Sequence, residues 1–154
     1  MKLRIITVGK PKERFIREGI AEYVRRLPSS FPLDIRSLPD VRGGAPETAM
    51  ERTGRAILKE LSPRDHAVLL DEAGDSMPSV RFSSHLFSTL ESVSGRLVFV
   101  VGGPFGVSWE VRQRSDEMLS LSPMTMTHEM CLLLLSEQIY RAWTIREGMS
   151  YHHG

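Results

Sequence analysis

The sequence has one cysteine and no long apolar run. A single cysteine excludes a disulfide framework within the chain, and the position of Cys131 in the apolar run Met130 to Leu135 predicts a buried, inert thiol. That run is too short to span a bilayer. The start of the chain has a short apolar stretch without a small-residue cleavage site, so it predicts a first strand and not a signal peptide. We expect a cytoplasmic protein.

The chain also has little net charge. Its 20 Lys and Arg side chains against 19 Asp and Glu give a formal charge of +1. This balance excludes a nucleic-acid binder of the strongly basic kind, so any nucleic-acid site must be a local patch. With 154 residues, 41% apolar residues and no linker, low-complexity tract or repeat, the chain is predicted to form one domain over residues 1–154.

Apolar runs of strand length alternate with segments of helical period. This pattern predicts an α/β fold: a mostly parallel, five- to six-stranded sheet with helices on both faces. The expected strands are Leu3–Val8, Leu33–Leu38, Ala67–Leu70, Leu97–Val101 and Met118–Leu121. The expected helices are Glu13–Leu27, Pro46–Leu61, Val80–Val93, Trp109–Glu117 and Thr127–Glu147. The last helix is apolar on more than one stripe, which favours a subunit interface.

Ligands of open α/β sheets bind beyond the carboxyl ends of the strands. Three segments follow expected strands with glycine or hydroxyl residues, namely Leu70–Gly74, Val101–Gly106 and Leu121–His128. Glycines in the second segment allow close backbone approach to a ligand, although a purely structural turn is about as common. The segment is neither G-x-G-x-x-G nor a P-loop, which disfavours a nicotinamide enzyme or an NTPase.

The third segment has two interpretations. Its hydroxyls at Ser122, Thr125 and Thr127, with backbone amides, could hold an adenine between apolar walls of Leu70, Leu121 and Met126. Alternatively the segment only caps the last helix, with Thr127 as N-cap. The residues alone leave both open.

His128-Glu129 begins like a zinc-protease helix, but Leu132 stands where the second histidine would be, so no metal site is expected. A histidine at a helix start is usually solvated. An arginine late in a helix, as Arg141 is, usually interacts with the helix dipole. A polar tail such as the one with Tyr151-His152 is usually frayed. The same three side chains also suit stacking on a flipped base and clamping its phosphate.

Taken together, the segments resemble the ribosomal large-subunit methyltransferase H family of the SPOUT superfamily. The matching segments span the chain: Val8–Lys10, Glu22–Leu27, Leu70–Gly74, Val101–Gly106, Leu119–His128, Glu137–Ala142 and Tyr151–His152. The resemblance implies an S-adenosylmethionine-dependent enzyme that methylates N3 of a pseudouridine in 23S ribosomal RNA. It further implies a C-terminal trefoil knot, an exception to the rule against knots, and a homodimer.

The resemblance also implies roles for particular residues. It assigns cofactor contacts to Leu70, Gly102, Leu121, Ser122, Pro123, Met124, Thr125 and Met126. It assigns Tyr151 and His152 of one subunit to the site of the other. We expect Arg141 to bind substrate and steady negative charge, and His128 to position the base or relay its proton. The chain departs from the family at Leu132, where members often carry an arginine.

Contact with RNA requires a basic surface, for which the candidates are Lys10, Lys12, Arg14, Arg25 and Arg26, although such runs are usually just solvated faces. Two other functions stay open: a non-catalytic, ribosome-associated nucleotide-binding module and a related knotted methyltransferase of transfer RNA. Methyl transfer to RNA distinguishes the enzyme from the module. The small size and Tyr-His tail favour the ribosomal enzyme over the transfer-RNA enzyme.

Overall fold

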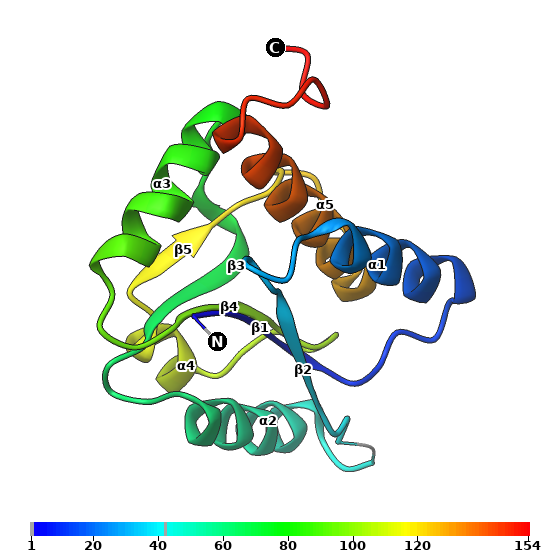
Figure 1. Cartoon of the computed structure of the whole chain (residues 1–154). Helices are drawn as coiled ribbons and strands as arrows, with labels where there is room; N and C mark the ends of the chain where they lie inside the picture. Colours follow the sequence, from blue (N-terminus) through cyan, green and yellow to red (C-terminus); the bar gives the residue numbers. More distant parts are fainter. Residues whose placement is uncertain (1, 42) are drawn as a thin grey trace.

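The computed structural model describes residues 2–41 and 43–154 (Figure 1). Strands and helices alternate over most of the chain. The strands are β1 (Leu3–Val8), β2 (Asp34–Leu38), β3 (His66–Asp75), β4 (Leu97–Val101) and β5 (Glu117–Leu119). The helices are α1 (Arg14–Arg26), α2 (Pro46–Glu60), α3 (Ser79–Ser92), α4 (Trp109–Arg114) and α5 (His128–Arg146).

The strands form one five-stranded sheet in the order β2-β1-β4-β3-β5, and every pairing is parallel. Ile5 at the centre of β1 aligns with Ile35 on one side and Phe99 on the other. The predicted α/β class and parallel sheet are confirmed. Because all strands run the same way, their carboxyl ends meet at one edge of the sheet, where a ligand site is expected.

Both faces of the sheet are buried, which explains the nearly continuous apolar strands. Leu3 and Ile5 of β1 belong to a core with α1, α3 and α5, whereas Ile6 and Val8 belong to a second core with α2 and α4. The alternation follows from the two-residue period of a strand. Figure 1 shows the corresponding layers, with α1, α3 and α5 on one side of the sheet and α2 and α4 on the other.

Helix α5 lies between α1 and α3 and also covers the sheet. Its inner residues Leu132, Leu135 and Ile139 are at most 2% exposed, and Leu133 approaches Gly19 of α1. Most of the apolar excess of this helix is therefore buried within the chain, and the excess by itself does not require a partner. Leu134, 39% exposed, lies on the remaining outward stripe.

Three element boundaries differ from the prediction by two residues or more. β3 extends to Asp75, because beyond Leu70 it still pairs with β5 after a register shift. β5 stops at Leu119, and the Ser120 N–H donates to the Asp75 carbonyl at 2.9 Å. α4 stops at Arg114, because the backbone of Ser115 is extended, with a ψ of 133°. The Ser115 hydroxyl donates to the Val111 carbonyl at 2.8 Å. The trefoil knot stays a prediction. No helix within the described residues is both long and apolar enough to cross a membrane.

Candidate functional site

A cleft of about 970 Å³ opens at the carboxyl edge of the sheet. It brings together the three segments chosen from the sequence, which come from the ends of β3, β4 and β5. Of the expected cofactor contacts, the cleft is lined by Leu70, Gly102, Leu121, Ser122, Met124, Thr125 and Met126. Pro123 is not among its lining residues, although it lies within the same loop. The geometry thus supports one ligand site; the individual roles stay predictions.

The glycine segment after β4 forms a tight turn on one wall of the cleft. The Gly106 N–H donates to the Gly103 carbonyl at 3.0 Å, and Gly106 has a φ of +82°, a conformation that side chains with a Cβ rarely adopt. A Cβ on Gly102 would lie 2.8 Å from Cγ1 of Val107. The turn therefore needs glycine at both places and presents bare backbone to the cleft.

The loop from Ser120 to Thr127 both caps a helix and lines the cleft. The predicted cap is confirmed, and adenine binding stays a prediction. The Thr127 hydroxyl accepts a hydrogen bond from the Met130 N–H at 3.2 Å and is the N-cap of α5. The Ser122 hydroxyl accepts from the Met124 N–H at 3.0 Å, and the Thr125 hydroxyl donates to Glu72 at 3.0 Å. The bond to Glu72 ties the loop to β3, and the other two stabilise the loop and its junction with α5.

Among the residues that the structure describes, carboxylates outnumber cations in the cleft. Asp71 is ion-paired with Arg112 at 2.6 Å. A hydrogen bond from the Ala73 N–H lowers the pKa of Asp71 below its ordinary value, and the Arg112 guanidinium lowers it further. The other acids that line the cleft are Glu13, Asp40, Glu72 and Glu129, and the other cations are Lys10 and Lys12. An excess of negative charge suits a positively charged ligand.

His128 and Cys131 lie on the cleft wall formed by the start of α5. Cys131 is partly buried against the core, so the expected burial is met only in part. The surrounding side chains still desolvate its sulfur and raise its pKa to about 11. At neutral pH it is a protonated thiol, as expected of an inert cysteine.

Arg141, Tyr151 and His152 form a second cluster near the end of α5. Glu137 holds Arg141 through an Nε–Oε1 contact of 2.9 Å and accepts a hydrogen bond from the Tyr151 hydroxyl at 3.3 Å. The Arg141 guanidinium lies 4.8 Å from the Tyr151 ring centre and 3.0 Å from Nδ1 of His152. Burial, then a hydrogen bond with Tyr23, raises the pKa of Tyr151 to about 12. The tail is therefore packed against α5 instead of frayed.

Glu137 was missed as a site residue, although its i, i+4 spacing to Arg141 indicates the pair. Asp71 and Arg112 were missed too. Asp71 directly follows a chosen strand ending, but its partner comes from α4, and no local pattern joins the two.

The two clusters lie at opposite ends of α5. His128 is the first residue of this helix, and Arg141 follows thirteen residues later. At 1.5 Å per residue, their backbones are about 20 Å apart. One chain therefore does not bring His128 and Arg141 to the same small molecule.

Leu132, at the position of departure from the family, is 2% exposed and belongs to the core beneath α5. It does not face the cleft. Among residues 2–41 and 43–154, no three His, Cys, Asp or Glu side chains are grouped so that they could hold a metal ion.

The fold and the cleft define a parallel α/β protein with a ligand site at the carboxyl edge of its sheet. Comparison with known proteins identifies the family. The sequence pattern of a family described as "Predicted SPOUT methyltransferase" matches residues 1–152. The chain belongs to the SPOUT methyltransferase family.

Two similar curated proteins carry the name ribosomal RNA large subunit methyltransferase H. The protein of Trichlorobacter lovleyi is 43% identical over 99% of this chain and 100% of its own length. The protein of Parabacteroides distasonis is 42% identical over 99% of both chains. A crystal structure of a probable methyltransferase from Bordetella pertussis aligns with a TM-score of 0.54 over 92% of this chain and 93% of its own, at 12% identity, which supports the fold.

Proposed function

We propose that this chain is an S-adenosylmethionine-dependent methyltransferase that methylates N3 of a pseudouridine in 23S ribosomal RNA. The observation that carries the proposal is the meeting of Leu70, Gly102 and the loop Leu121–Met126 in one cleft of a SPOUT methyltransferase. Full-length relatives at about 40% identity carry the name of a large-subunit ribosomal RNA methyltransferase. Work on ribosomal RNA implies a cytoplasmic location.

The cleft fits the cofactor in shape and charge. Gly102 lines the cleft with backbone alone, at a position where a Cβ would collide with the Val107 side chain. Leu70 and Leu121 offer apolar walls for an adenine. The excess of carboxylates balances the positive charge of a sulfonium. When bound, S-adenosylmethionine supplies the activated methyl group, and the chain must orient the acceptor and manage its proton.

N3 of pseudouridine carries a proton that must leave before or during methyl transfer. His128 lines the cleft with a side chain able to accept or relay a proton. Arg141 stays positively charged beside Glu137, which raises its pKa, and can stabilise negative charge on the base carbonyls or a nearby phosphate. In this proposal His128 handles the proton and Arg141 the charge.

Because these two side chains lie at opposite ends of α5, the proposal needs a second copy of the chain. A homodimer would bring the Arg141, Tyr151 and His152 cluster of one subunit to the cleft of the other. The outward stripe of α5, with Leu134 exposed near Glu137 and Gln138, offers a surface for this contact. The dimer is thus a requirement of the proposed chemistry.

The direct test uses purified large ribosomal subunits and assembled ribosomes that lack the modification, with tritiated S-adenosylmethionine. We expect label in 23S RNA and, after nuclease digestion, a methylated pseudouridine. A protein that binds the cofactor but transfers no methyl group would instead be a non-catalytic module. Label in transfer RNA, with none in ribosomal RNA, would contradict the proposed substrate.

The shared site is tested by mixing two inactive variants, His128→Ala and Arg141→Ala. If the site is completed by the partner, a mixed dimer keeps one intact site with both side chains. Activity should therefore return after subunit exchange, whereas each variant alone stays inactive. A mixture as inactive as its parts, with exchange confirmed by mass spectrometry, would contradict the composite site.

A further inference from the structure

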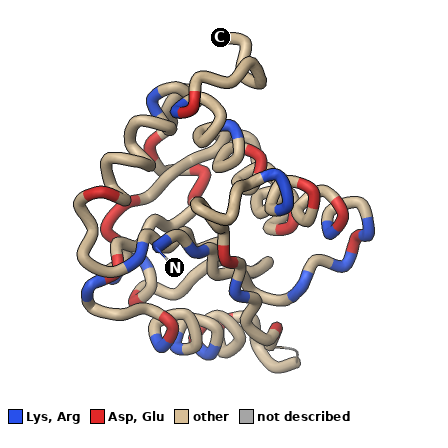
Figure 2. The backbone as a smooth tube through the Cα atoms, in the orientation of Figure 1, with Lys and Arg blue, Asp and Glu red and all other residues tan. Residues whose placement is uncertain are grey.

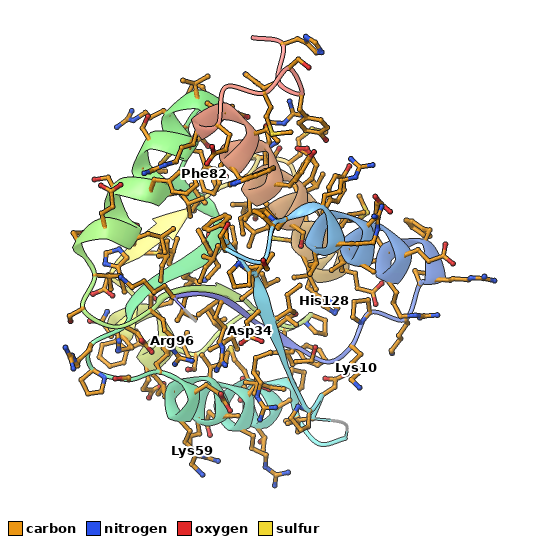
Figure 3. All side chains as sticks on the ribbon, viewed as in Figure 1. Lys10, Asp34, Lys59, Phe82, Arg96 and His128 are labelled. Carbon is orange, nitrogen blue, oxygen red and sulfur yellow. The ribbon has the colours of Figure 1, made fainter. Side chains whose placement is uncertain are left out.

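The loop between β1 and α1 carries two lysines at the edge of the cleft. Lys10 and Lys12 line the cleft together with His128. Figure 3 labels Lys10 and His128 on the same side of the molecule. In Figure 2 the blue positions of lysine and arginine follow this loop into the start of α1. A cationic rim thus borders the site proposed for the acceptor base.

The backbone of this loop is held in place by three hydrogen bonds. The Arg17 guanidinium donates to the carbonyls of Pro11 and Lys12, at 3.1 and 2.6 Å. The Lys12 N–H donates to the carboxylate of Glu129 at the start of α5. Arg17 and Glu129 are therefore occupied with the loop itself. The two lysine side chains extend from a backbone that needs little ordering on binding.

The other basic candidates each have a carboxylate partner, and Arg25 and Arg26 share one. Arg14 pairs with Glu18 at 2.7 Å, and Arg25 and Arg26 both pair with Glu22, at 2.6 and 2.8 Å. The pKa of Glu22 is lowered by the guanidinium groups of Arg26 and, to a smaller extent, Arg25. Part of the positive charge of both arginines is therefore offset by Glu22.

Lys10 and Lys12 differ from these arginines. Neither has a carboxylate within 4.0 Å in the part of the chain that the structure describes, although Glu13 and Asp40 line the same cleft. Arg112, the remaining cation among the described residues of the cleft, is paired with Asp71. Within the cleft, the positive charge available to an external anion therefore lies on the β1–α1 loop, and an ammonium group is a strong partner for a phosphate.

We propose that Lys10 and Lys12 bind backbone phosphates of the RNA strand that carries the acceptor base and so hold that strand at the cleft. The inference rests on the proposed function and names how the substrate is held there. Phosphate contacts position a nucleic acid without reading its sequence. Because Lys10 and Lys12 line the cleft itself, this rim is the basic patch next to the proposed site of the acceptor base.

The test compares Lys10→Gln, Lys12→Gln and their double variant with Arg55→Gln. Arg55 is an exposed residue of α2, in the opposite layer, and its change removes the same charge. Binding to unmodified large ribosomal subunits is measured by sedimentation at several salt concentrations. Binding of S-adenosylmethionine is measured by calorimetry, and methylation gives KM and kcat for the subunits.

We expect each lysine variant to bind subunits about five- to eightfold more weakly near 0.1 M salt, the effect of losing the counterions released by one phosphate contact. The slope of log affinity against log salt should fall by about 1 per lysine. KM should rise while kcat and cofactor affinity stay close to wild type. Arg55→Gln should match the wild type throughout.

Two results would overturn the inference. Equal salt slopes for the wild type and the double variant would show that the lysines contact no phosphate. Weaker cofactor binding with unchanged subunit binding would assign them to the cofactor carboxylate instead. A wild-type protein that transfers no methyl group would refute the proposed function, and subunit binding would still test the lysines separately.

Discussion

Gly102→Ala is the substitution that most sharply tests whether the turn after β4 is built around a ligand. The new Cβ would lie 2.8 Å from Cγ1 of Val107 and 3.6 Å from the backbone of Gly106. The first distance is too short for two carbon atoms, so either the Val107 side chain or the turn must shift. Because Gly102 and Val107 both line the cleft, the shift changes its wall.

The free-energy cost of Gly102→Ala is that of adding a methyl group at a tightly packed position. Overpacking of this kind costs about 1–3 kcal/mol. If the cost falls on the ligand-binding form of the turn, cofactor affinity drops by roughly five- to 150-fold, since about 1.4 kcal/mol is a factor of ten. If it falls on the whole fold, the free energy of unfolding drops by the same amount and affinity is unchanged.

The companion change Val107→Ala removes both γ methyl groups of Val107, including the Cγ1 that the new Cβ meets. In a double-mutant cycle it should restore most of the affinity lost in Gly102→Ala, because the two residues are in direct contact. Calorimetric titration with S-adenosylmethionine measures the affinity, and urea unfolding measures the stability of the same variants. Wild-type affinity in Gly102→Ala, or no recovery in the double variant, would refute the proposed role of the turn.

Three further predictions concern other parts of the chain. Asp65 is almost fully buried; burial favours its neutral form, but hydrogen bonds from Arg96 and from the Ser62 N–H outweigh burial and lower its pKa. Asp65→Ala should therefore lower the free energy of unfolding at pH 7 by about 3 kcal/mol. Because the stabilising form of Asp65 is the carboxylate, this loss of stability should shrink as the pH falls below 3.8, the ordinary pKa of an aspartate. An equal loss in urea unfolding at pH 7 and at pH 3 would contradict a stabilising role of the Asp65 carboxylate. The pKa of Cys131 is about 11, against an ordinary 9.0, so Cys131 should react with iodoacetamide about 100-fold more slowly at pH 8 than an unperturbed thiol. A titration midpoint near pH 9 would instead show that its sulfur is solvated. Arg141→Ala should lower kcat with cofactor affinity nearly unchanged, because the proposed role of Arg141 is to stabilise charge on the acceptor base and not to hold the cofactor. An equal loss of cofactor binding would place Arg141 in the cofactor site.

The sheet and the position of the cleft were predictable because both follow from local patterns. Apolar runs such as Leu97–Val101 are strands buried on both faces, and parallel strands bring their carboxyl ends to one edge. The glycine turn was recognisable from Gly102, Gly103 and Gly106 alone. Thr127 was correctly expected to cap α5, since a hydroxyl residue before an apolar helix is the usual signal.

Contacts between distant elements were not predictable. The pairing of Asp71 with Arg112 joins a strand end to α4, and the hydrogen bond from the Lys12 N–H to Glu129 joins the first loop to α5. The prediction from α5 was too simple for a related reason. Its apolar excess signalled a partner, but α1, α3 and the sheet bury most of it, and Leu134 remains outside.

A crystal structure of the protein with S-adenosylmethionine is the measurement that tests the central claim most directly. It should show the adenosine between Leu70 and the loop Leu121–Met126, against the bare backbone at Gly102. The methyl group should be open to the side bordered by His128. Density for the cofactor at any other place on the molecule would contradict the assignment of this cleft.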